Sequence, residues 1–183
     1  MRLFTAIDLP PDIIERLDAL IAKLRPLAPI RWSSAGNLHI TTKFIGQWPE
    51  EQLPQLQHAL SSVSCRPRIP IQVTGLGFFP NLKSPRVFWA GVNPTRELVV
   101  LAGDIDHAVS NLVKPEIRAY SPHLTLARIN PGGGLTALRN QVEQLGQPDF
   151  GSFAVDRLYL YLSEPSSSGS VYTKLSEFPF TTQ

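Results

Sequence analysis

Two short segments decide how this chain folds: Asn37-Leu-His-Ile-Thr-Thr-Lys-Phe-Ile-Gly46 and Ser121-Pro-His-Leu-Thr-Leu-Ala-Arg128. Each contains a histidine and a threonine two positions apart in a largely apolar run. Side chains alternate across a strand, so His39 and Thr41 share one face, as do His123 and Thr125. The apolar neighbours pack on the opposite face. The segments therefore predict two half-buried strands, each of which presents an imidazole beside a hydroxyl.

The two segments belong to a longer internal repeat whose offset is 84 residues (123 − 39). The opening segment Arg2-Leu-Phe-Thr-Ala6 recurs at this offset as Arg86-Val-Phe-Trp-Ala90, and residues of the following stretch recur as well: Pro10 as Pro94, Leu17 as Leu101 and Ile21 as Ile105. A repeat of this size predicts two similar halves related by a pseudo-twofold axis. We therefore expect His39 and His123 to meet at one central cleft, and Phe4 and Phe88 to be equivalent.

Hydrophobic periodicity predicts the same elements in each half. Strands are expected at Leu3 to Asp8 and Val87 to Val92. Apolar residues at helical spacing predict a helix after each, one with Asp12 near its start and one that begins at Thr95. Further helices are expected at Glu50 to Val63 and Leu135 to Leu145. Two strand pairs complete the halves: Ile69 to Phe79 with Arg86 to Val92, and Ser152 to Leu162 with Ser170 to Phe178, the latter joined by a turn at Pro165 to Gly169.

The predicted fold is therefore α+β, with two pseudo-twofold-related lobes around a central cleft. Each lobe is an antiparallel sheet with helices packed on its outer face, and residues 1–183 form a single bilobal domain. A chain of 183 residues buries roughly 70% of its unfolded surface, which is enough for a core without metal or disulfide staples. Charged residues make up 17%, which excludes the disordered class.

Charge and cysteine content restrict the partners and the compartment. The net charge of +2 suits an anionic ligand but is too weak for a long footprint on duplex nucleic acid. Cys65 is the one cysteine, so cysteines cannot build a disulfide framework or a four-ligand zinc site. Asp8 and the Pro10-Pro11 pair interrupt the apolar start before a signal peptide can form. We expect a cytoplasmic protein without membrane contact.

Two imidazoles on opposite sides of a cleft can hold opposite protonation states, so that one accepts a proton while the other donates one. The threonine hydroxyls would donate hydrogen bonds to the oxygens of a bound anion. A zinc site is disfavoured because no third ligand at standard spacing accompanies either motif. A Ser-His hydrolase is disfavoured because the chain lacks a Gly-x-Ser-x-Gly turn. The pattern favours metal-independent acid-base chemistry on an anion, with no cofactor.

The opening segment Arg2 to Pro10 and the two histidine segments together resemble the two-histidine (2H) phosphoesterase superfamily, and within it the RNA 2',3'-cyclic phosphodiesterases, historically called 2'-5' RNA ligases. The resemblance implies that His39 protonates the leaving 3' oxygen and that His123 accepts a proton from the attacking water, which leaves a 2'-phosphate. It also implies that Thr41, Thr125 and the basic Arg128 bind the phosphate. First motifs in the family more often have leucine at the place of Thr42.

Other residues are ambiguous from sequence. Strict alternation places Arg128 on the face opposite His123, so a bulge or the strand end must bring it to the phosphate. The same count places Lys43 on the face of His39, as a substrate contact or a solvated lysine. Trp32 either stacks on a nucleobase or packs on the core, and Phe4 is either core or a ligand contact. His58 and His107 lie in helical stretches and are expected to be surface or helix-packing residues. Arg2, Arg31, Arg86 and Arg118 could rim an anionic groove, although solvation is favoured for each of them.

The expected function is hydrolysis of 2',3'-cyclic phosphates at RNA ends by an enzyme that needs no protein partner and is a monomer. One alternative keeps the site but takes small cyclic or 2'-5' linked nucleotides, which a dependence on substrate length would distinguish. A weak 2'-5' RNA ligase activity follows from reversal of the reaction. A silent module that only binds RNA ends belongs to another class, and turnover of a cyclic mononucleotide would exclude it.

Overall fold

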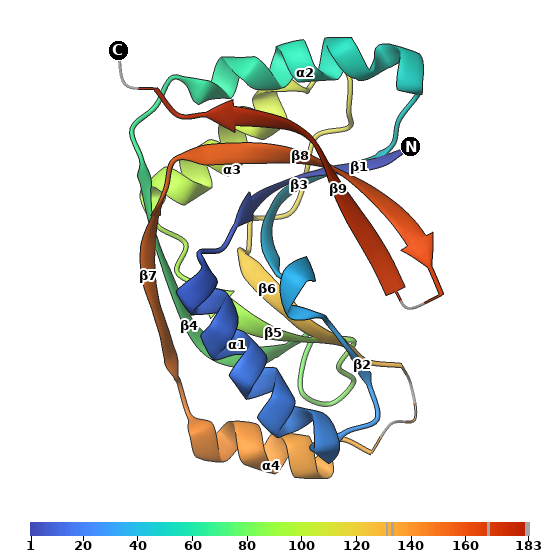
Figure 1. The fold of residues 1–183 in the computed structure, drawn as a ribbon, viewed down its shortest axis with the longest axis vertical. Helices are drawn as coiled ribbons and strands as arrows, with labels where there is room; N and C mark the ends of the chain where they lie inside the picture. Colours follow the sequence, from blue (N-terminus) through green and yellow to red (C-terminus); the bar gives the residue numbers. More distant parts are fainter. Residues whose placement is uncertain (131, 133, 168, 182–183) are drawn as a thin grey trace.

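We describe a computed structural model in which residues 1–130, 132, 134–167 and 169–181 are defined. Its strands form two antiparallel sheets (Figure 1). The four-stranded sheet has the order β3-β1-β8-β9, and the five-stranded sheet has the order β2-β6-β5-β4-β7. The strand bounds are β1 Arg2–Asp8, β2 Arg31–Trp32, β3 His39–Gln47, β4 Ile69–Phe79, β5 Val87–Val92, β6 His123–Arg128, β7 Asp149–Val155, β8 Arg157–Ser166 and β9 Gly169–Pro179.

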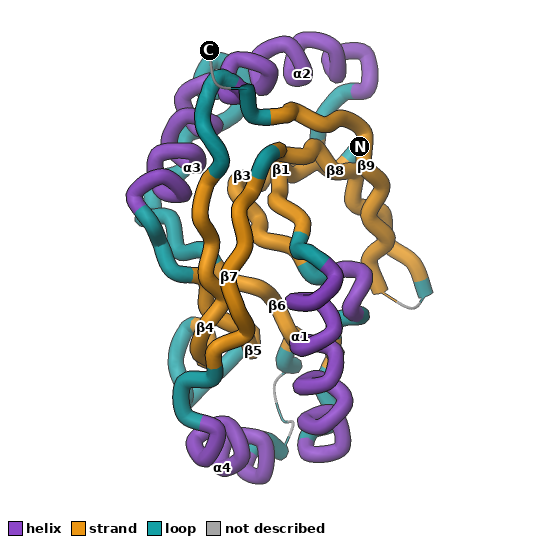
Figure 2. Tube along the Cα trace, turned by 60° about the vertical axis from the view of Figure 1, so that its left-hand side comes forward, coloured by secondary structure: helices purple, strands orange, loops and turns teal. Residues whose placement is uncertain are grey.

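Helices α2 and α4 lie at opposite ends of the molecule, and α3 and α1 run along its sides beside the strands (Figure 2). They are α1 Pro11–Leu24, α2 Leu53–Ser61, α3 Arg96–Ala108 and α4 Thr136–Leu145. Helix α3 begins as expected after Thr95, whose hydroxyl accepts a hydrogen bond from the Leu98 amide at 3.3 Å. The helical stretch expected from Glu50 to Val63 is α2 flanked by single 3-10 turns, Glu50–Gln52 and Ser62–Ser64.

Helices α1 and α3 each follow a strand of one sheet and contact a strand of the other sheet. Helix α1 follows β1 of the four-stranded sheet and packs against β7 of the five-stranded sheet, where Arg16 donates to the Phe150 carbonyl at 2.7 Å. Helix α3 follows β5 of the five-stranded sheet and packs against β3 of the four-stranded sheet as well as β4 of its own sheet. The crossing joins the apolar faces of both sheets in one core, which includes Leu3 and Ile40 from one sheet and Phe88 and Leu124 from the other.

The fold confirms the α+β class with two antiparallel sheets, and β4 pairs with β5 as expected. The single strand expected from Ser152 to Leu162 is wrong. The chain passes from β7 to β8 at Asp156, and these strands lie in different sheets: β7 pairs with β4, and β8 pairs with β1 and β9. The expected turn at Pro165 to Gly169 is shorter, because β8 extends to Ser166 and β9 starts at Gly169; Ser168 lies outside the described residues.

The repeat also does not keep a single offset, so aligning its two copies requires a gap. Cross-strand pairing matches Phe4 with Phe44 in one sheet and Val87 with Arg128 in the other. The offset is therefore 84 residues for β3 against β6 (128 − 44) but 83 for β1 against β5 (87 − 4). A slip of one residue moves a side chain to the other face of a sheet. Phe4 and Phe88 are consequently not equivalent: Phe4 lies on the histidine face and Phe88 in the main core.

Candidate active site

Both motif histidines are held by the same backbone contact. The Nδ1 atom of His39 lies 2.8 Å from the carbonyl oxygen of Asn37, and Nδ1 of His123 lies 2.8 Å from that of Ser121. A carbonyl oxygen can only accept, so Nδ1 carries the proton and donates it. The Nε2 atom is then the free nitrogen of each ring. It can accept a proton when the ring is neutral and donate a proton when the ring is charged.

A bulge follows the threonine in each motif strand. Thr5 pairs with Lys43 and Ala6 with Thr41, which leaves Thr42 as an extra residue in β3. In β6, Leu126 is the extra residue, at the equivalent position of the repeat. A bulge changes which face the next side chains take. Beyond each bulge, Phe44 and Arg128 therefore lie on the faces that carry His39 and His123.

The two halves of the site come within electrostatic range of each other. Burial lowers the pKa of His39, and the charges of Arg128 and His123, which belong to the other sheet, lower it as well. The hydrogen bond to Asn37 and the carboxylate of Asp8 act in the opposite direction. Strands β3 and β6 are also in direct contact. The fold thus brings together the two histidines that stand 84 positions apart (123 − 39) in the chain.

Thr41 and Thr125 use their backbone, and not their hydroxyls, to hold the strands in place. The Tyr120 hydroxyl donates to the carbonyl of Thr41 at 3.1 Å, and the Ser33 hydroxyl donates to the carbonyl of Thr125 at 2.7 Å. Tyr120 immediately precedes the second motif, so its bond ties the two motifs directly. Within the described part of the chain, neither threonine hydroxyl has a hydrogen-bond partner. Both hydroxyls are available to a ligand.

An aromatic cluster surrounds His39, and the sequence did not reveal it. The His39 ring lies 4.8 Å from Phe4, 5.1 Å from Tyr172 in an edge contact and 6.2 Å from Tyr161. The Tyr161 hydroxyl donates to Asp8 at 2.5 Å, opposite His39 on β1. Only the fold brings β1, β8 and β9 together, so no local pattern signals this cluster. Phe4 is 4% exposed and its ring lies against the imidazole, so of its two predicted roles the structure supports packing.

His123 has a sparser setting. Its ring makes an edge contact with Phe79 at 5.0 Å, and Phe79 in turn contacts Trp89 at 5.0 Å. Trp89 lies against Gly77 and Gly91, where an added Cβ would come within 2.5 Å of the side chain or the neighbouring backbone. These glycines allow the large indole to lie flat along the sheet. The five-stranded sheet therefore presents a different surface from the four-stranded one.

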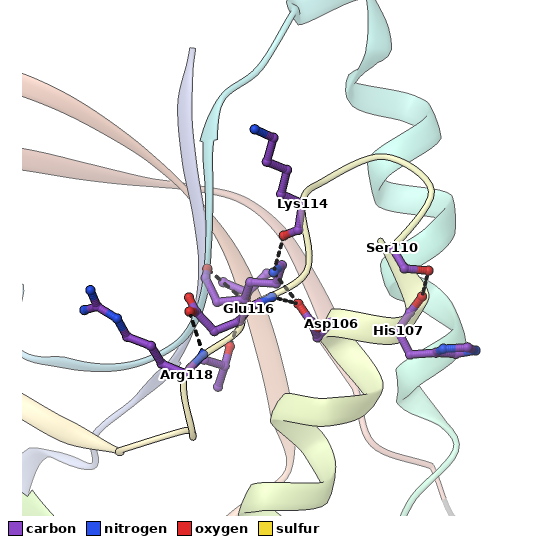
Figure 3. A network of polar contacts seen from close by, with 9 residues as sticks. Asp106, His107, Ser110, Lys114, Glu116 and Arg118 are labelled. Carbon is purple, nitrogen blue, oxygen red and sulfur yellow. Dashed lines mark hydrogen bonds and ion pairs between the residues drawn. The ribbon is translucent and has the colours of Figure 1, made fainter.

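The placement predicted for Lys43 is wrong. The Thr42 bulge turns Lys43 to the outer face of its sheet, where it is 7% exposed. Its ammonium forms an ion pair with Asp106 of α3 and donates to the Lys114 carbonyl at 3.3 Å. Figure 3 shows Asp106 beside Glu116, whose amide donates a hydrogen bond to the Asp106 carboxylate at 3.0 Å. Lys43 thus holds the segment that leads to the second motif and does not reach the histidine face.

Trp32 packs on the core side of its sheet. It pairs with the fully buried Ala127, its indole N–H donates to the Ala28 carbonyl at 3.2 Å, and its ring meets the edge of Phe88 at 5.9 Å. Of its two predicted roles, packing is the one that the structure supports. His58 and His107 lie exposed on helices away from the motifs, as expected; Figure 3 includes His107, whose carbonyl accepts from Ser110 at 2.7 Å.

Two further observations concern the described residues as a whole. No helix among them is long and apolar enough to cross a membrane. No group of three or more His, Cys, Asp or Glu side chains among them is arranged to hold a metal ion. Metal independence itself stays a prediction.

Two bulged strands that bring their histidines together from opposite sheets define the class: this is a two-histidine phosphoesterase. The particular family follows from comparison with known proteins. The chain belongs to the LigT-like phosphoesterases, whose family pattern matches residues 7–89 and 91–172, one match for each half of the repeat. The resemblance stated from the sequence is confirmed.

Full-length relatives agree. The chain is 34% identical over 178 residues to the RNA 2',3'-cyclic phosphodiesterase of Methanocaldococcus jannaschii, which covers 97% of this chain and 100% of the relative. It is 32% identical over 178 residues to the enzyme of the same name from Archaeoglobus fulgidus, with 97% and 99% covered. The crystal structure of E. coli LigT with 3'-AMP is similar with a TM-score of 0.78 at 29% identity, over 99% of this chain and 98% of the other.

Proposed function

We propose that this protein hydrolyses the 2',3'-cyclic phosphate at the end of an RNA strand to a 2'-phosphate, without a metal ion. One observation carries the proposal: two Nδ1-anchored imidazoles, two unpartnered threonine hydroxyls and the exposed Arg128 share the inner faces of two sheets in contact. The relatives named RNA 2',3'-cyclic phosphodiesterase support the substrate class.

In the proposed mechanism, the cyclic phosphate lies between the two motif strands. The hydroxyls of Thr41 and Thr125 and the guanidinium of Arg128 donate to its non-bridging oxygens, whose charge increases in the transition state. His123 accepts a proton at Nε2 as water forms the new P–O bond, and His39 gives its Nε2 proton to the 3' oxygen as the P–O3' bond breaks. The water and the 3' oxygen must lie in line, so the two imidazoles act from opposite ends.

The charges around His39 bear on its role as the acid. Burial, Arg128 and His123 keep the pKa of His39 below the ordinary value in the free protein. A bound cyclic phosphate adds a negative charge next to the ring, which raises this pKa and favours the protonated form needed for catalysis. Asp8 acts in the same direction as the phosphate. One imidazole must be neutral and the other charged, so the rate depends on pH with two limbs that belong to the coupled pair.

Phe44 is the proposed platform for the base next to the cyclic phosphate. It is 63% exposed, lies on the same face as His39 and contacts Phe4 at 6.4 Å. Base-aromatic stacking needs an exposed ring face and tolerates any sequence. The E. coli LigT structures with 3'-AMP, ATP and NADP+ support a site for nucleotides, and they keep small cyclic or 2'-5' linked nucleotides as the alternative substrates.

The test is incubation with 2',3'-cyclic nucleotides and with RNA that ends in a cyclic phosphate, in the presence of a chelator. Phosphorus NMR then identifies the position of the product phosphate. We expect 2'-phosphates from both substrates and unchanged activity after chelation. Loss of turnover that a divalent ion restores, or a 3'-phosphate product, would contradict the proposal. Faster turnover of 2'-5' linked dinucleotides than of RNA ends would favour the alternative.

A further inference from the structure

We propose that a basic hollow beside Arg128 binds a phosphodiester of the RNA strand upstream of the cyclic end. This inference rests on the proposed function and names RNA, rather than a mononucleotide, as the substrate it serves. The hollow has a volume of about 210 Å³ and lies between the connection from β4 to β5, the segment that follows β6, and α4. The charged residues among those that line it are Lys83, Arg86 and Arg139.

These three cations have no counter-charge. None of them takes part in an ion pair within the described part of the chain, and no described residue that lines the hollow is acidic. The Nε atom of Arg139 is buried without a hydrogen-bond partner among the described residues. A buried donor that lacks a partner destabilises the fold, and so do like charges gathered around one space. An anion with several oxygens would relieve both.

The position of the hollow points to the substrate's own strand. Its lining begins where the second motif strand ends: Arg86 precedes Val87, which pairs with Arg128, and the Ile129 amide donates to the Arg86 carbonyl at 2.8 Å. Asn130, which also lines the hollow, is two residues from Arg128, and two residues span at most about 7 Å. Alternation turns Arg86 and Ile129 to the face opposite Arg128, so an RNA whose terminal phosphate lies at Arg128 would pass round the end of β6 to bring one of its next phosphates to the hollow.

The opposite end of β4 offers a matched control. Arg68 lies just before β4 and Arg96 begins α3, whose Thr95 contacts Pro70 near the start of the same strand. These arginines are exposed, as are Lys83 and Arg86, so substitution in either pair removes the same charge from the surface. Strand β4 has 11 residues and separates the two pairs by about 30 Å.

The experiment compares Lys83→Gln/Arg86→Gln with Arg68→Gln/Arg96→Gln. We measure kcat/KM on a cyclic mononucleotide and on a pentanucleotide with a 2',3'-cyclic end. For the first variant we expect a loss of about tenfold on the pentanucleotide only, because one charge-assisted phosphate contact is removed. The slope of log K against log salt should also decrease by about 0.7 per lost phosphate contact. The control variant should match the native protein on both substrates.

Equal losses on both substrates, or no loss on either, would overturn the proposal. Binding of a pentanucleotide that ends in a 2'-phosphate is measured in parallel by fluorescence anisotropy, with inorganic phosphate as competitor. This arm does not depend on turnover, so absence of hydrolysis refutes the proposed function while the hollow is still tested. Arg139→Lys, which keeps the charge but removes the buried Nε, should bind the pentanucleotide more weakly than the native protein; unchanged binding would exclude Arg139 from the site.

Discussion

In β3 the residues that follow Thr41 are Thr42, Lys43 and Phe44, whereas in β6 the equivalent places hold Leu126, Ala127 and Arg128. The backbones of the two strands agree, because the extra residues of the two bulges, Thr42 and Leu126, occupy equivalent positions of the repeat. The side chains that follow the bulges differ. One strand presents an aromatic ring on the histidine face and buries a charge behind it, and the other presents a cation and buries a methyl group.

This difference fits the proposed reaction, in which a symmetric pair of histidines acts on an asymmetric substrate. A terminal nucleotide has a base on one side and a phosphate on the other, and the two strands offer a stacking surface and a guanidinium. The carboxylate beside His39 has no counterpart across from His123: Asp8 occupies the place that Gly91 has in the other sheet. Identical motifs thus stand in unlike surroundings, which allows them to take different protonation states.

The largest expected effect comes from removing the motif histidines, which both strands contain. His39→Ala and His123→Ala should each lower kcat by about 10²-fold or more, the usual contribution of a positioned acid or base. The double variant should be far less than multiplicatively worse, since the two residues act as a unit. Steady-state kinetics on a cyclic mononucleotide measures both. His58→Ala and His107→Ala, at exposed helical positions, are the controls; a comparable loss in either would contradict the assignment.

The buried charge behind Phe44 should matter for stability. Asp106→Asn leaves the Lys43 ammonium without a counter-charge in a place that is 7% exposed, and the free energy of unfolding should decrease by about 3 kcal/mol. Denaturant unfolding gives the value. Asp104→Asn, on the same helix, removes the more exposed Arg66 pair and should cost less than about 1 kcal/mol. Lys43→Met/Asp106→Leu, which copies the uncharged second strand, should recover most of the loss; a further loss would refute this account.

Arg128→Gln should lower kcat/KM by about tenfold or more for every cyclic nucleotide, whatever its base, because the phosphate loses a charge-assisted contact. The same change removes a positive charge that lowers the pKa of His39, so this pKa should increase. The limb of the pH profile that reports His39 should then move to higher pH. Equal activity of the native and variant proteins, or a shift to lower pH, would argue against Arg128 as the phosphate ligand.

Phe44→Ala should have the smallest effect, a loss of about 1 kcal/mol in the binding of cyclic nucleotides, since one stacking contact is removed. The effect should be absent for a ribose 2',3'-cyclic phosphate without a base, and Phe44→Tyr should retain native affinity. KM measurements on the two kinds of substrate separate the outcomes. A loss that is equal with and without the base would exclude stacking and indicate a structural role.

Sequence reasoning predicted the parts of the site that depend on alternation and repetition. The histidine and threonine pairs follow from side-chain period and from the 84-residue offset (123 − 39). For Arg128 the sequence leaves a bulge or the strand end open, and the structure has a bulge, at Leu126. Nothing in the sequence indicates the bulge at Thr42, so alternation places Lys43 on the wrong face. A bulge depends on pairing with the neighbouring strand, and a local pattern does not contain that information.

Other features depend on contacts between distant segments. The aromatic cluster at His39 combines β1, β8 and β9, and the crossover of α1 and α3 joins elements that are far apart in the chain. The sequence does not indicate the division between β7 and β8 at Asp156, because buried and exposed side chains alternate on both sides of it. The sequence also does not indicate the one-residue difference in offset between β1 and β5. The residue types Arg, Phe and Ala recur at an offset of 84, whereas positions on the same face of the two sheets recur at an offset of 83 (87 − 4).

The central claim is that His39 is the acid and His123 the base, and one measurement tests it directly. A cyclic-phosphate analogue with an activated 3' leaving group needs no protonation at that oxygen, so kcat on it depends on the base alone. We expect His39→Ala to regain near-native kcat on this analogue, while His123→Ala stays impaired by about 10²-fold or more. Equal recovery of both variants, or recovery of His123→Ala alone, would contradict the assignment.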